Sequence, residues 1–98
     1  WDPVTHVFAS SDFARQTEQA LRNMMRALEA AGARGEHLLR VTWYVTDRDA
    51  YNAARREIGG HWKSIVGPHY PAMAVVIVAG LLEPEALVEV EATAVVPE

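Results

Sequence analysis

The sequence from residue 68 to residue 98 reads PHYPAMAVVIVAGLLEPEALVEVEATAVVPE, and it decides the fold. Two strands are predicted in it, at about residues 72–79 and 87–96, because both runs are rich in β-branched and apolar residues. The first run is apolar at every position, so a strand there needs cover on both of its faces. The second run carries Glu89 and Glu91 on one face of an otherwise apolar strand. We therefore expect a sheet that is covered on both sides, with a site near the acidic pair.

An amphipathic helix and a further strand are predicted upstream. Residues 11–31 repeat apolar side chains at three- and four-residue spacing, and Gly32 supplies a helix stop. Residues 38–46 are rich in β-branched and aromatic residues, which favours a strand. Alternation places one apolar set on a single face of this strand: Leu39, Val41, Trp43 and Val45. This face is expected to belong to the core.

A second helix is predicted to begin at the capping residues 46–49 and to end at Gly67-Pro68. Its apolar stripe consists of Tyr51, Ala54, Ile58, Trp62 and Ile65. Gly59-Gly60 lies inside this helix and costs about 1 kcal/mol per glycine relative to alanine. Two explanations stay open: the helix breaks at the glycines, or another backbone approaches them closely.

The order of these elements predicts an α+β fold in one domain that spans residues 1–98. A strand–helix–strand step implies a right-handed crossover between parallel strands, and the last two strands could be antiparallel. Because two helices cover only one face of a single mixed β-sheet, the other face needs a partner, which we expect to be another subunit. Trp1-Asp2-Pro3 is typical of a strand that runs into a turn, so we also expect N-terminal strands upstream of this sequence.

Composition narrows the classes of function. The chain is 50% hydrophobic and 22% charged, as in an ordinary globular domain. Its 9 basic residues are scattered and its net charge is −4, so no nucleic-acid partner is expected. No cysteine is present, which excludes disulfides and thiolate chemistry, and the histidines lack a metal-ligand spacing. We expect no metal, no cofactor, no membrane partner and a cytoplasmic location.

Several short sequence motifs occur together in an order that is found in one known family. They are residues 16–17 (QT), 20–23 (ALRN), 28–33 (LEAAGA), 41–47 (VTWYVTD), 70–72 (YPA) and 88–95 (VEVEATAV). Each motif is weak alone, but together they extend from the first helix to the C-terminus. In these residues the chain resembles the RidA/YjgF family of reactive-intermediate deaminases.

The resemblance implies a fold like that of Bacillus chorismate mutase, with one mixed sheet, two helices packed on one face, and the other face buried in a homotrimer. It also implies three clefts between subunits. Known members hydrolyse enamines and imines, such as 2-aminoacrylate, to keto acids and ammonia. The implied function is therefore binding of a small molecule in these clefts, with hydrolysis of imines or enamines.

Glu89 and Met73 are the two positions at which the resemblance bears on chemistry. Glu89 matches the glutamate with which active members position or activate water, so it is the candidate catalytic residue. Met73 stands where active deaminases have an arginine that grips the substrate carboxylate. A thioether cannot make the two charge-assisted hydrogen bonds of a guanidinium. Since residues 74–82 carry no charge, the sequence predicts weak binding of acidic substrates and better binding of apolar or cationic ones.

Tyr70 and Trp1 are the other candidate substrate-binding residues. Tyr70 lies in the loop before the strand that carries Met73, and loops concentrate binding residues. The alternative is that the Tyr70 ring packs at an interface. The resemblance places Trp1 at the border of the cleft, whereas His69 is interpreted as a turn residue.

The two strand glutamates also have a plainer interpretation. Glu89 and Glu91 can simply form a solvated strand face, or they can pair with Arg40 or Arg48 across the sheet. Glu91 in particular is interpreted as structural.

Three classes of function stay open. The first is an imine or enamine hydrolase, and the second is a non-enzymatic small-molecule-binding or scaffolding trimer that has lost deaminase activity. The third, RNA cleavage, is the least favoured because the chain is acidic and lacks a basic stripe.

Overall fold

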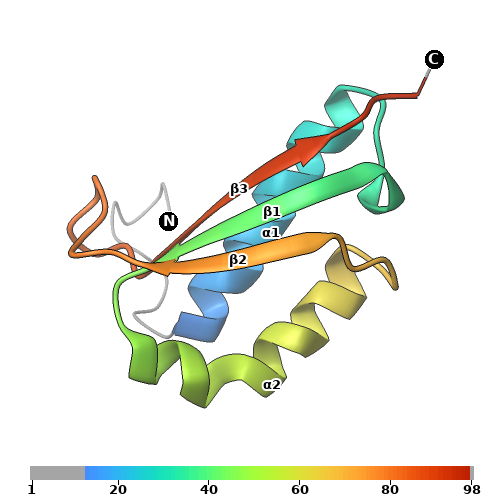
Figure 1. Cartoon of the computed structure of the whole chain (residues 1–98). Helices are drawn as coiled ribbons and strands as arrows, with labels where there is room; N and C mark the ends of the chain where they lie inside the picture. Colours follow the sequence, from blue (N-terminus) through green and yellow to red (C-terminus); the bar gives the residue numbers. More distant parts are fainter. Residues whose placement is uncertain (1–12, 98) are drawn as a thin grey trace, which may run out of the picture.

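The computed structural model describes residues 13–97 (Figure 1). In this range two long helices alternate with strands. In order, the elements are α1 (Phe13–Ala30), a short 3-10 helix (Gly35–His37), β1 (Leu38–Val45), α2 (Arg48–Ile65), β2 (Ala72–Ile77) and β3 (Val88–Ala94). Each element lies within a few residues of its predicted position, and the α+β class is confirmed.

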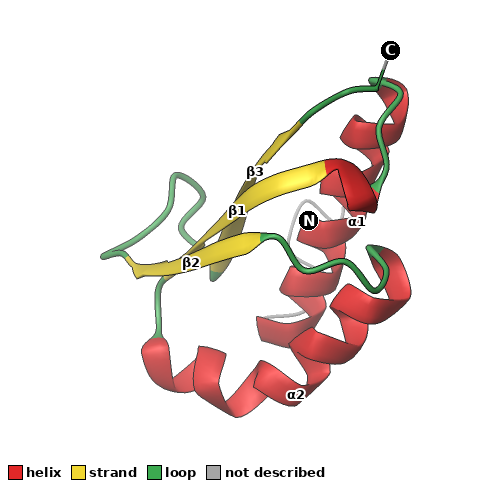
Figure 2. Cartoon of the chain, turned by 45° about the vertical axis from the view of Figure 1, so that its right-hand side comes forward, coloured by secondary structure: helices red, strands yellow, loops and turns green. Residues whose placement is uncertain are grey.

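The strands form one mixed sheet in the order β2-β1-β3. β1 runs parallel to β2 and antiparallel to β3. The parallel pairing across α2 agrees with the prediction, but the last two strands are not neighbours, because β3 pairs with β1 on the side opposite β2. Both helices lie on one side of this sheet (Figure 2), as the sequence predicts.

β1 is the central strand, and its inward face forms the middle of the core. Val41, Trp43 and Val45 are at most 3% exposed. The prediction that Leu39 shares this face is wrong, because Leu39 is 54% exposed whereas Leu38 is 2% exposed. The cause is a shift of register at this point in the pairing with β3, which inserts one residue and turns Leu39 outward.

α2 begins at the predicted cap and runs through both glycines without a break. The Asp47 carboxylate accepts a hydrogen bond from the Ala50 backbone N–H at 3.1 Å. A Cβ atom at Gly59 or Gly60 would meet no atom of the described residues within 4 Å. The predicted break is therefore wrong, since the helix is continuous, and no other backbone of residues 13–97 approaches the glycines.

β2 is the least covered of the described elements. All six of its residues are exposed, including the large apolar ones: Met73, Val75, Val76 and Ile77 are each about two-fifths exposed. α2 shields only part of the face that carries Met73, and the opposite face, which carries Val76, has no helix over it. The sequence predicts a strand that needs cover on both faces, and residues 13–97 of one chain leave this need unmet.

Candidate functional site

The face of the sheet without helices carries both strand glutamates. Glu89 and Glu91 of β3 are exposed there, and Glu89 lies opposite Tyr44 of β1. No ion pair joins either carboxylate to a basic side chain among the described residues, so neither Arg40 nor Arg48 neutralises them. Both carboxylates are therefore available to a ligand, to solvent or to another subunit.

Met73 lies on the other face, in a hollow between β2 and α2. It is paired with Val41, whose side chain points into the core, so Met73 points to the helix side of the sheet. The hollow has a volume of about 230 Å³. Trp43 and Trp62 form its buried floor, and Met73 and Val75 form the wall that β2 contributes.

Tyr70 closes this hollow where the chain enters β2. Its ring stacks on that of Trp62, with centroids 6.0 Å apart and planes at 21°. Trp62 Nε1 donates a hydrogen bond to the His69 carbonyl oxygen at 2.9 Å, and His69 Nε2 lies 3.0 Å from the Leu38 carbonyl oxygen. These contacts hold the loop against the core, so the Tyr70 ring is held in place as one wall of the hollow.

Tyr70 and Met73 come together in the structure, whereas Glu89 lies apart from them. Met73 is on the face turned toward α2, and Glu89 is on the face without helices, so the sheet itself separates the two side chains. A site that combines both needs Met73 from one copy of the chain and Glu89 from another. Trp1, the remaining predicted binding residue, lies outside the described residues.

Arg55 is the charged residue of this hollow that the sequence analysis missed. It lies on α2 and lines the same hollow as Met73 and Tyr70. A signal was present, because Arg55 follows Tyr51 by four residues and precedes Ile58 by three, which places it on the apolar stripe of the helix. The sequence around Met73 could not indicate it, since α2 and β2 meet only after folding.

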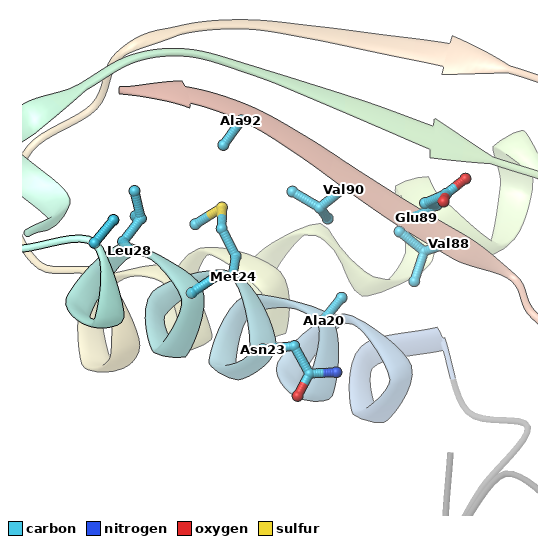
Figure 3. Close-up of a pocket in the computed structure, with 10 residues that line it drawn as sticks. Ala20, Asn23, Met24, Leu28, Val88, Glu89, Val90 and Ala92 are labelled. Atoms are coloured by element: carbon cyan, nitrogen blue, oxygen red, sulfur yellow. The ribbon is translucent and has the colours of Figure 1, made fainter. Parts of the chain in front are cut away.

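A larger groove of about 510 Å³ lies between α1 and β3. Figure 3 shows Met24 and Leu28 of α1 facing Val90 and Ala92 of β3, so the groove is mainly apolar. Glu89 lies at its end, with the carboxylate turned away from α1 (Figure 3). The groove therefore offers apolar contact surface but no charged group directed into it from these residues.

Residues 13–97 contain neither a cluster of metal ligands nor a membrane-spanning helix. No three His, Asp or Glu side chains in this range gather closely enough to hold a metal ion. None of the helices in the same range is long and apolar enough to cross a membrane.

Comparison with known proteins identifies the relatives of the chain. The family model described as endoribonuclease L-PSP matches residues 1–96. Rv2704 from Mycobacterium tuberculosis, a member of the YjgF/YER057c/UK114 family, is 37% identical with a TM-score of 0.72, covering 88% of this chain and 70% of that one. No curated protein matches the sequence.

Two other solved structures show the same fold. YyfB from Yersinia pestis, a protein of the Rid family, is 30% identical with a TM-score of 0.76, covering 96% of this chain and 70% of that one. TdcF from E. coli, whose structure contains bound serine, is 27% identical with a TM-score of 0.79, covering 95% of this chain and 71% of that one.

Proposed function

The chain belongs to the YjgF/RidA family, also described as endoribonuclease L-PSP, and on this premise we propose that it is a homotrimer that binds a small molecule in clefts between subunits and hydrolyses imines or enamines there. TdcF, a relative with bound serine, supports a small polar molecule as the ligand. The family motifs that contain Tyr70 and Glu89 support the same clefts, whereas Met73 departs from the family pattern.

The uncovered sheet is the observation that carries this proposal. β2 exposes Val76 on the face over which no helix of residues 13–97 lies, and Met73, Val75 and Ile77 stay about two-fifths exposed on the helix side. Buried apolar surface contributes about 25 cal/mol per Å², so covering these β2 side chains favours association. If Glu89 and Met73 act in one site, they come from different copies of the chain, because the two lie on opposite faces of each sheet.

The chemistry proposed for Glu89 is activation of water. Its carboxylate accepts a proton from a water molecule whose oxygen adds to the imine carbon, and the nitrogen receives a proton. The resulting carbinolamine then breaks its C–N bond and leaves as a carbonyl compound and ammonia. One water is consumed for each ammonia released, and no oxidant or cofactor is needed.

Met73 favours a second candidate function, a non-enzymatic trimer that binds a small molecule. An arginine at this position would hold a substrate carboxylate through two charge-assisted hydrogen bonds, and a thioether forms neither. RNA cleavage, the activity named in the family description, is not favoured by a net charge of −4.

An ammonia-release assay separates the two candidates. Imines are generated in the cuvette by an amino-acid oxidase acting on acidic, apolar and basic amino acids. Glu89→Gln is expected to lower turnover about 100-fold or more, because it removes the general base. Glu91→Gln is the matched control, since Glu91 lies on the same face of β3 and is also unpaired among the described residues.

The control is expected to keep most of the activity. Equal turnover in wild type and Glu89→Gln would refute the role of Glu89. Ligand-induced thermal shifts without turnover on any imine would favour the non-enzymatic trimer instead.

A further inference from the structure

Arg55 and Met73 line one hollow from opposite sides. Arg55 reaches it from α2 and Met73 from β2, with Tyr70 at the end and the indoles of Trp43 and Trp62 as the floor. Arg55 is the one charged side chain among the described residues that line this space. The hollow therefore combines an apolar, partly aromatic surface with a single guanidinium.

The guanidinium of Arg55 makes no ion pair and no side-chain hydrogen bond within residues 13–97. Gly59, one helical turn further along α2, lines the same hollow, and a Cβ there would meet nothing within 4 Å in the described residues. The absence of a side chain at Gly59 leaves space for a ligand beside Arg55.

A cationic ligand does not suit this hollow, in contrast to the preference for apolar or cationic substrates that the sequence predicts from Met73. Aromatic faces alone would attract a cation, but Trp43 and Trp62 are at most 3% exposed, and the Tyr70 ring is stacked on one of them. No acidic side chain lines the hollow among the described residues, and Arg55 would repel a second positive charge. The charge distribution favours an anion with a short apolar part.

We propose that Arg55 binds the carboxylate of the ligand from α2, taking the part that the resemblance assigns to an arginine at the position of Met73. The substrate class is then small α-imino or enamino acids, with the apolar part resting on Met73 and Val75. Serine, the ligand bound in the relative TdcF, also carries a carboxylate. This inference rests on the proposed function for its reaction, but its binding step is tested separately.

The test uses 2-oxobutyrate, a keto acid of the product type, and its uncharged amide, titrated into the full chain by calorimetry. Wild type is expected to bind the acid at least about 10-fold more tightly than the amide, since a hydrogen-bonded charge pair contributes that much. Arg55→Gln is expected to lose this preference. Arg56→Gln is expected to change affinity less than about twofold, because Arg56 is exposed like Arg55 but does not line the hollow.

A compensating variant strengthens the test. Adding Met73→Arg to Arg55→Gln returns a guanidinium to the same hollow, so it is expected to restore most of the affinity for 2-oxobutyrate. In ammonia release, Arg55→Gln is expected to raise KM for the imine of 2-aminobutyrate more than it lowers kcat.

The outcomes separate this inference from the proposed function. If Glu89-dependent turnover survives but acid and amide bind equally, or Arg55→Gln and Arg56→Gln behave alike, the inference is overturned and the proposed function stands. If Arg55-dependent binding of 2-oxobutyrate occurs without any turnover, the hydrolase proposal fails and the inference stands. Failure of wild type to bind 2-oxobutyrate overturns the inference.

Discussion

Gln16 ties α1 to the loop that leads into β3 and its glutamates. Its side-chain amide donates to the Glu85 carbonyl oxygen at 3.1 Å and accepts from the Leu87 N–H at 2.8 Å, and the residue is 8% exposed. Gln16→Ala is expected to lower the free energy of unfolding by about 1–3 kcal/mol, because it leaves partly buried polar groups without partners. Urea denaturation measures this loss. Gln19→Ala, an exposed glutamine on the same helix, is the control and should change stability by less than about 0.5 kcal/mol; equal losses would contradict the argument.

At the same scale, the candidate site was only partly predictable. Comparison with the family motifs points to Glu89 and Met73. The strand pairing, however, determines the face of the sheet on which each side chain lies. Arg55 could not be predicted from the sequence around Met73, because residues 74–82 are uncharged and Arg55 lies 18 residues before Met73. Helical spacing from Tyr51 would have placed Arg55 at the edge of the apolar stripe, yet only the packing of α2 beside β2 brings this exposed residue to the hollow that Met73 lines.

At the scale of the element, α2 could be made more stable by replacing one of its glycines. Gly60 is exposed and lies in a continuous helix, and a Cβ atom added there would meet no atom of the described residues within 4 Å. Gly60→Ala is therefore expected to raise the free energy of unfolding by about 0.5–1 kcal/mol, because glycine loses more backbone entropy in a helix. Thermal denaturation, with ammonia release measured in parallel, checks this. A loss of stability would show that another subunit lies against Gly60.

Element types were easier to predict than their details. Periodicity located both helices and all three strands of residues 13–97, because apolar spacing follows directly from helix and strand geometry. The register shift beside Leu39 could not be predicted, since Leu38 and Leu39 are equally apolar and only pairing with β3 selects which is buried. The order β2-β1-β3 was missed for a similar reason: it depends on which edge of β1 the last strand reaches.

At the scale of the whole molecule, the uncovered sheet face links stability to assembly. Val76 of β2 lies in the same row of this face as Tyr44 and Glu89. In a single chain Val76 is 41% exposed, so a charge there would be solvated and would cost little. In a trimer that buries this face, the same charge would lose its hydration, which costs several kcal/mol unless it is paired, and Glu89 in the same row offers no opposite charge.

Val76→Glu is therefore expected to dissociate the assembly while leaving the fold of each chain intact. Wild type should sediment with three times the mass of the 10.8 kDa chain, and Val76→Glu should sediment as a monomer with unchanged far-UV circular dichroism. Leu82→Glu is the control, because Leu82 is a 98% exposed loop residue, and it should remain assembled.

If the clefts need Glu89 from one copy and the hollow of another, Val76→Glu also loses ammonia release, whereas Leu82→Glu keeps it. A monomeric wild type with full activity would refute both the trimer and the shared site, since one chain places Glu89 and Met73 on opposite faces of its sheet.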